Sequence, residues 1–155
     1  MPAVPRIVLD TNIVLDLFVF SDPRMQALES DVRSGALCWI AAAPMRSELA
    51  RVLTYAHIAA RLRTADRGAD FVLAQFDALV TLKPVAPKAA FTCKDADDQQ
   101  FIDLALAYRA FLLSKDRAVL CMAKRLRSLG VEVATHWSVP PATQTTTLSG
   151  VGACR

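Results

Sequence analysis

The sequence has few of the residues that define several common protein classes. Among 155 residues there are 5 glycines, 4 cysteines and 2 histidines, and aromatic residues make up 7%. The isolated glycines exclude a collagen-like chain and a glycine-rich phosphate loop. The cysteines form no Cys-x-x-Cys pair and the histidines no His-x-x-x-His pattern, so a zinc site is not expected. We expect the cysteines to be reduced and mostly buried.

The sequence also lacks a long uninterrupted hydrophobic run. Its most apolar N-terminal stretch, Ile7 to Phe20, contains Asp10, Asn12 and Asp16, which excludes a transmembrane span or a signal-peptide core there. Hydrophobic residues nevertheless make up 54% of the chain and charged residues 21%, enough for a buried core. We therefore expect a soluble, cytoplasmic protein with no membrane partner.

Short apolar runs alternate with helical patterns along the chain, which is typical of a parallel α/β sheet. Strands are expected at residues 6–10, 37–40, 111–114 and 131–134. Helices are expected at residues 13–20, 24–33, 65–80 and 118–129, with further amphipathic stripes after Pro44 and from Asp97. After Trp137 the chain becomes rich in Pro, Thr and Ser, so we expect one domain at 1–137 and a tail at 138–155 that is not a separate domain.

Acidic residues follow two of the predicted strands. Asp10 ends the first strand, and Asp116 comes two residues after the strand at 111–114. In open parallel sheets, ligands bind just beyond the carboxyl ends of the strands. The two carboxylates are therefore expected to face one crevice.

Two further acids lie near the starts of predicted helices. Glu48 stands at the edge of an apolar stripe. Asp98 precedes Phe101 by three residues and Ala105 by seven, which puts it over the buried face of its helix. The same spacing puts Asp103 on the opposite face, where we expect it to be solvated.

Four carboxylates that converge at one sheet edge would repel one another and lose hydration, which raises their pKa values unless a cation compensates. A hard divalent ion with oxygen ligands, Mg²⁺ or Mn²⁺, is the usual compensation, and such ions promote phosphodiester hydrolysis. Each acid taken singly has a simpler interpretation as a helix cap, because carboxylates accept hydrogen bonds from the free N–H groups of a helix start. Only the set of four favours a metal site.

These motifs, in this order, resemble a PIN domain. The chain opens with Ile7-Val8-Leu9-Asp10-Thr11-Asn12 and continues with Ser47-Glu48-Leu49. Its second half contains the acidic stretch from Asp95 to Ala105 and then Leu113-Ser114-Lys115-Asp116. The resemblance covers residues 6–135, and it is closest to the PIN-family toxin components of bacterial toxin–antitoxin systems.

The resemblance implies a three-layer α/β/α fold with a central, mostly parallel sheet, and a metal-dependent endoribonuclease that acts as a toxin. It implies that the catalytic acids are Asp10, Glu48, Asp98 and Asp116, and that Asp10, Asp98 and Asp116 hold Mg²⁺ or Mn²⁺. Asn12 and Ser114 match positions that support the site, and the neighbouring Asp97 is the alternative third ligand. The implied partners are an RNA substrate, a cognate antitoxin protein and a second copy of the chain in a homodimer.

The placement of basic residues is more informative than the net charge, which is only +3. A polyanion such as RNA needs cations around an acidic metal site. The predicted RNA contacts are Arg46, Arg51, Lys115 and Arg117. Taken singly, each of them also has a simpler interpretation as an ordinary solvated side chain. Aromatic platforms for base stacking are not evident.

Two other functions fit parts of this pattern. A catalytically silent PIN-like module would bind RNA or protein without turnover, but it is expected to lose at least one acid, and all four are present. A phosphoryl-transfer enzyme of the haloacid dehalogenase type requires Asp at position 12, where this chain has Asn12. A phospho-accepting receiver requires an acidic pair after the first strand, which is also missing.

Overall fold

A computed structural model describes residues 4–89 and 96–138. Within these residues the strands are β1 (Arg6–Leu9), β2 (Cys38–Ala41), β3 (Val80–Leu82), β4 (Phe111–Leu113) and β5 (Val133–Ala134). The α-helices are α1 (Thr11–Phe18), α2 (Gln26–Ser34), α3 (Ala43–Val52), α4 (Ala56–Thr64), α5 (Ala69–Leu79), α6 (Gln99–Tyr108), α7 (Arg117–Leu120) and α8 (Ala123–Ser128). Two 3-10 helices, η1 (Pro23–Met25) and η2 (Ala96–Asp98), precede α2 and α6.

The strands form one sheet in the order β3-β2-β1-β4-β5, and every pair is parallel. Ile7 of β1 lies opposite Trp39 of β2 on one side and opposite Phe111 of β4 on the other. The chain builds outward from β1 to β3 and then returns to add β4 next to β1. The direction of winding therefore reverses between β1 and β4, and such a switch point leaves a crevice at the carboxyl ends of the two strands.

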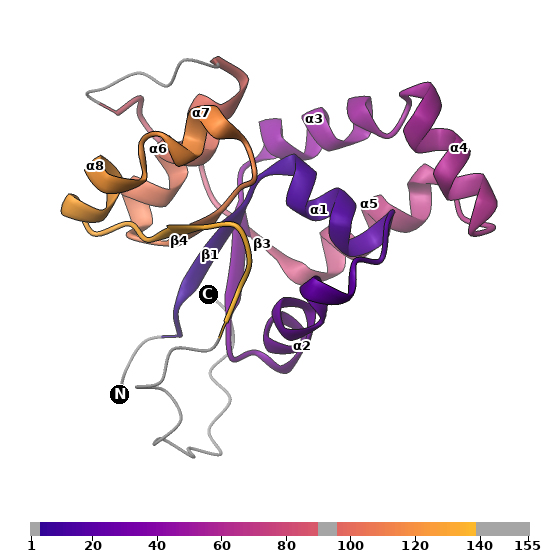
Figure 1. Ribbon diagram of the computed structural model, residues 1–155, viewed down its shortest axis with the longest axis horizontal. Helices are drawn as coiled ribbons and strands as arrows, with labels where there is room; N and C mark the ends of the chain where they lie inside the picture. The colour runs from indigo at the N-terminus through magenta and orange to yellow at the C-terminus, as the bar shows by residue number, and fades with distance from the viewer. Residues whose placement is uncertain (1–3, 90–95, 139–155) are drawn as a thin grey trace.

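Helices cover both faces of the sheet (Figure 1). The helices α1 to α5 lie on one side, and α6 to α8 lie on the other. Right-handed crossovers require this arrangement, because the winding direction changes after β3. The predicted class, a three-layer α/β/α fold with a central parallel sheet, is confirmed.

The hydrophobic core fixes α1 and α5 against the same face of the sheet. Trp39 of β2 is 1% exposed. Its ring stacks on Phe18 of α1 at 6.2 Å between centroids and meets Phe76 of α5 edge-on at 5.3 Å. Aromatic contacts of this size contribute both buried area and a preferred geometry. They hold α1 in place directly after β1, where Asp10 stands.

Trp137 anchors the end of the described chain. Its indole N–H donates a hydrogen bond to Asp31 Oδ2 at 2.7 Å, and its ring packs edge-on against Phe111 at 5.1 Å. The predicted tail lies outside the described residues beyond residue 138, so the domain boundary at Trp137 stays a prediction. Among the described residues, no helix is long and apolar enough to cross a membrane.

Three segments differ from the secondary structure expected. The stripe that continues from Leu49 to Ala56 is divided between α3 and α4, because the Thr54 hydroxyl and backbone N–H both bond to the Arg51 carbonyl and tighten the turn. The segment 118–129 is likewise divided between α7 and α8. The last residue of the helix expected at 65–80 instead begins β3, which the apolar helical pattern before it concealed.

The cysteines also differ from expectation. Cys38 on β2 is buried, but it is disulfide-bonded rather than reduced. Cys121 is free but exposed. Neither cysteine is therefore the reduced, buried small hydrophobe that the sequence predicted.

Candidate metal centre

The polar residues that follow β1 and β4 are held together by one buried hydroxyl. The backbone N–H of Asp10 donates to the Leu113 carbonyl of β4 at 3.0 Å. The Ser114 hydroxyl, which is 0% exposed, donates to Asp10 Oδ2 at 2.6 Å and accepts from the backbone N–H of Asp116 at 3.0 Å. Ser114 therefore positions the side chain of one acid and the backbone of the other.

Asp10 and Asp116 also cap helices. Asp10 Oδ1 accepts the backbone N–H of Asn12 at 3.3 Å at the start of α1, and Asp116 Oδ1 accepts that of Ala118 at 2.8 Å at the start of α7. The simpler interpretation of these acids as caps is therefore correct, but a cap uses only one oxygen of a carboxylate. Asn12 supports Asp10 through its backbone N–H, and the Asn12 residue itself is exposed.

Asp98 comes to the same place from the opposite helical layer. It ends η2 directly before α6 and is 6% exposed, whereas Asp97 is exposed. One carboxylate oxygen from each of Asp10, Asp98 and Asp116 lies within 4.8 Å of the others. Oxygens that share one Mg²⁺ lie at most about 4.2 Å apart, so the three are close to a chelating arrangement. This grouping favours Asp98 over Asp97 as the third acid.

The electrostatics of Asp10 fit a hard cation. Burial raises the pKa of the Asp10 carboxyl, and the charge of Asp116 raises it further, while the hydrogen bonds from Ser114 and Asn12 oppose the rise. Both causes of the rise are penalties on a negative charge, and a bound divalent ion relieves both of them. The donor set, three carboxylates, is the type that Mg²⁺ and Mn²⁺ take in proteins.

Glu48 lies beside the group of three acids. The Thr11 hydroxyl donates to Glu48 Oε2, and a guanidinium nitrogen of Arg51 is 3.8 Å from Oε1. Burial raises the pKa of the Glu48 carboxyl, opposed by the Thr11 hydrogen bond, and the charges of Asp10 and Asp97 add to the rise. The charge of the site therefore affects the pKa of Glu48, although Glu48 is outside the group of three acids whose oxygens meet.

The predicted RNA-contacting residues are held differently from one another. Arg46 makes two hydrogen bonds to Asp77 of α5, at 2.7 and 2.8 Å. Arg51 contacts Glu48. Lys115 forms an ion pair with Asp16. Arg117, at the start of α7, is exposed.

Sequence reasoning missed two residues that support the site. Thr11 is 8% exposed and binds Glu48 across 37 positions of sequence. Asp16 is 7% exposed and binds Lys115, which stands between Ser114 and Asp116. A signal for Asp16 was present, because an acid within the apolar run Val14-Leu15-Asp16-Leu17-Phe18 needs a buried partner.

The prediction that Asp103 is solvated is wrong. Asp103 is half-buried, and its Oδ1 accepts from the Gln99 amide at 2.8 Å and from the backbone N–H of Ala89 at 2.9 Å. The chain that leaves β3 runs along α6 and supplies this N–H group. The helical spacing correctly puts Asp103 on the face opposite Asp98. The spacing of one helix does not reveal that another segment, the one containing Ala89, covers that face.

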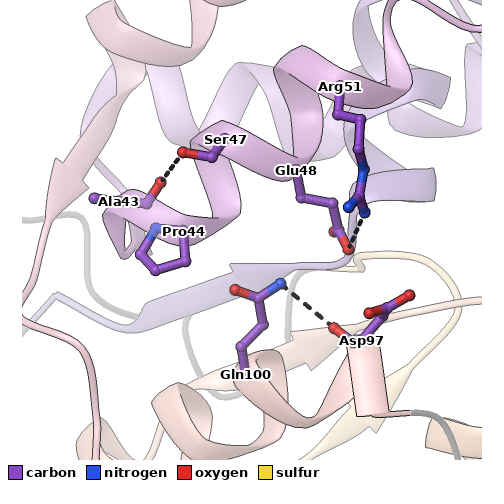
Figure 2. A pocket seen from close by; sticks show the side chains of 7 residues that line it. All are labelled: Ala43, Pro44, Ser47, Glu48, Arg51, Asp97 and Gln100. Atoms are coloured by element: carbon purple, nitrogen blue, oxygen red, sulfur yellow. Dashed lines mark hydrogen bonds and ion pairs between the residues drawn. The ribbon is translucent and has the colours of Figure 1, made fainter.

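A groove adjoins the acids between α3 and α6 (Figure 2). It has a volume of about 620 Å³, and Glu48 at its edge connects it to the metal centre. Its other polar or ring-bearing lining residues are Pro44, Ser47, Arg51, Asp97 and Gln100. A volume of this size is typical of small-molecule sites.

Comparison with known proteins agrees with this architecture. The chain matches the PIN domain family over residues 6–118, a range that includes all four predicted acids and Ser114. No curated protein matches the chain. The family match spans most of the sequence, and three of the acids that it contains, Asp10, Asp98 and Asp116, meet at the switch point of the parallel sheet. The chain belongs to the PIN domain family.

Proposed function

We propose that this chain is a Mg²⁺- or Mn²⁺-dependent endoribonuclease that hydrolyses RNA phosphodiester bonds. The observation that carries the proposal is the approach of three carboxylate oxygens, from Asp10, Asp98 and Asp116, to within 4.8 Å of one another. Membership of the PIN domain family supports a nuclease-type reaction. The chemistry of the donor set supports a hard divalent ion.

The residues of the chain divide the work of the reaction between them. A bound divalent ion lowers the pKa of an attacking water and stabilises charge on the leaving oxygen. Asp10, Asp98 and Asp116 would hold the ion, and the hydrogen bond that Ser114 donates to Asp10 Oδ2 favours the ionised form of this carboxylate. Glu48 would accept the proton of the water at Oε1, because Oε2 already accepts from the Thr11 hydroxyl.

Cations near the site would bind the RNA backbone. Arg51, Lys115 and Arg117 stand beside Glu48 and Asp116 and are the proposed phosphate contacts. Arg46 is proposed as a further contact, and it would have to give up two hydrogen bonds to Asp77 to reach a phosphate.

The biological role that we propose is that of a toxin in a toxin–antitoxin pair. The chain would act on cytoplasmic RNA as a homodimer and be inhibited by a cognate antitoxin protein. Induced expression of the wild type in a bacterium should arrest growth, whereas the Asp10→Asn variant should not. Light scattering on the purified protein tests the homodimer.

Cleavage of RNA by purified protein tests the enzymatic proposal. Labelled single-stranded RNA is incubated with and without Mn²⁺, and with the Asp10→Asn variant. We expect cleavage to need the metal and to fall at least about 100-fold in the variant, since the variant loses a charge of the site. Asp70→Asn, which changes an exposed acid at the start of α5, is the matched control and should cleave normally. Full activity in the Asp10→Asn variant would overturn the proposal.

A further inference from the structure

The groove between α3 and α6 has a chemistry different from that of the metal centre. Glu48 and Asp97 carry two negative charges on its walls, and Arg51 carries one positive charge. A phosphate inside the groove would meet a net negative surface, so the phosphate contact proposed for Arg51 belongs to the end beside Glu48 and the rest of the groove is unsuited to the RNA backbone. Pro44 supplies an apolar pyrrolidine ring at the opposite end, with Ser47 on the same helix turn (Figure 2). Such a combination suits a flat, neutral ligand with polar edges.

The polar groups that line the groove accept hydrogen bonds more than they donate them. The Gln100 amide N–H donates to the Asp97 carbonyl at 3.4 Å, while its Oε1 points toward Pro44 (Figure 2). The Ser47 hydroxyl donates to the Ala43 carbonyl at 3.4 Å, so the lone pairs of Oγ are what it offers to a ligand. The carboxylate of Asp97 adds further acceptor oxygens. A ligand that fits these groups must supply donors.

We propose that the α3/α6 groove binds a nucleobase next to the scissile phosphate and selects cytosine over uracil. This inference rests on the proposed ribonuclease function. The two bases have nearly the same shape, but cytosine carries an exocyclic amino donor at the position where uracil carries a carbonyl acceptor. The amino group can donate to Gln100 Oε1, whereas the uracil carbonyl at the same position would face this acceptor. Gln100 is half-buried, and an acceptor that is partly shielded from water favours a ligand that supplies the matching donor.

The position of the groove fits a flanking base. Glu48 lines it and accepts a hydrogen bond from the hydroxyl of Thr11, the residue directly after Asp10. A nucleotide whose phosphate lies at the acids can therefore place its base along α3 toward Pro44. In this arrangement Gln100 is a specificity-determining residue that does not touch the reacting atoms.

Mapping of cleavage sites in a random-sequence single-stranded RNA pool tests the proposal. We expect wild-type cuts to favour cytosine over uracil about 10-fold or more at one flanking position. The Gln100→Leu variant, similar in size but without the amide, should lose this preference while its Mn²⁺ affinity and melting temperature stay unchanged. Gln26→Leu, at an exposed glutamine on α2, should keep the preference. No preference in the wild type, or the same preference in Gln100→Leu, would overturn the inference.

A binding measurement separates this inference from the proposed function. Oligo(C) and oligo(U) of eight nucleotides are titrated into the Asp10→Asn variant, which is not expected to cleave them. We expect oligo(C) to bind about 10-fold more tightly, and the addition of Gln100→Leu to equalise the two affinities. If the wild type does not cleave RNA but this difference is found, the nuclease proposal fails and the base site stands. If RNA is cleaved and the two oligomers bind equally, the base site fails and the nuclease stands.

Discussion

Removal of the Ser114 hydroxyl should weaken both the fold and the metal site. The hydroxyl is fully buried, donates to Asp10 Oδ2 at 2.6 Å and accepts from the backbone N–H of Asp116 at 3.0 Å. Ser114→Ala deletes both bonds without adding volume. It also removes the hydrogen bond that holds down the pKa of Asp10, so the pKa of this carboxyl should rise further.

The expected loss of stability follows from the two bonds. A hydrogen bond to a charged group contributes about 1.5–3 kcal/mol, and a buried N–H left without an acceptor costs about 1–3 kcal/mol. Asp116 is only half-buried, so water can replace part of the second bond. We therefore expect Ser114→Ala to reduce the free energy of unfolding by about 2–4 kcal/mol. Loss of this support should weaken Mn²⁺ binding by about 10- to 100-fold.

Urea unfolding in EDTA measures the stability, and calorimetric titration measures Mn²⁺ affinity. Ser128→Ala is the matched control, because its hydroxyl bonds to the Arg125 carbonyl at 2.6 Å on an exposed turn of α8. That variant should stay within about 0.5 kcal/mol of the wild type. A loss below about 0.5 kcal/mol in Ser114→Ala, with Mn²⁺ affinity unchanged, would refute the bridging role of the hydroxyl.

Two further predictions concern charge. Burial raises the pKa of folded Asp10 above its ordinary value of 3.8, so the contribution of this one carboxyl to the stability of the metal-free protein should be fully present below that value and be lost as the pH rises through the folded pKa. Thermal melts in EDTA should show this slope in the wild type and less of it in Asp10→Asn. In the ion pair between Asp16 and Lys115, the Asp16 side chain is 10% exposed and the Lys115 side chain 39% exposed. Lys115→Met leaves a buried carboxylate without its cation, whereas Asp16→Asn leaves an ammonium that water can reach. Lys115→Met should therefore destabilise the fold more than Asp16→Asn. Urea unfolding of both variants checks the order, and the reverse order would contradict the assignment.

The sequence alone determined the parallel α/β class of the sheet and the order of the acids along the chain, but it missed β3 and did not give the strand order. Alternating β-branched runs and helical stripes predicted a parallel sheet, because each run is buried on both faces. An acid directly after a buried strand placed Asp10 at the carboxyl edge of the sheet. The helical spacing placed Asp98 on the covered face of its helix, where it is 6% exposed. These inferences succeeded because each depends on one element and its period.

Only the tertiary structure decided which side chains meet between elements. The bonds of Thr11 to Glu48, of Lys115 to Asp16 and of Ala89 to Asp103 join segments that no local period relates. The same holds for the groove between α3 and α6, which exists only because the two helices approach the sheet edge from opposite layers. Side-chain contacts between distant segments depend on how the layers pack, and a hydrophobic pattern records only which face of an element is covered, not what covers it.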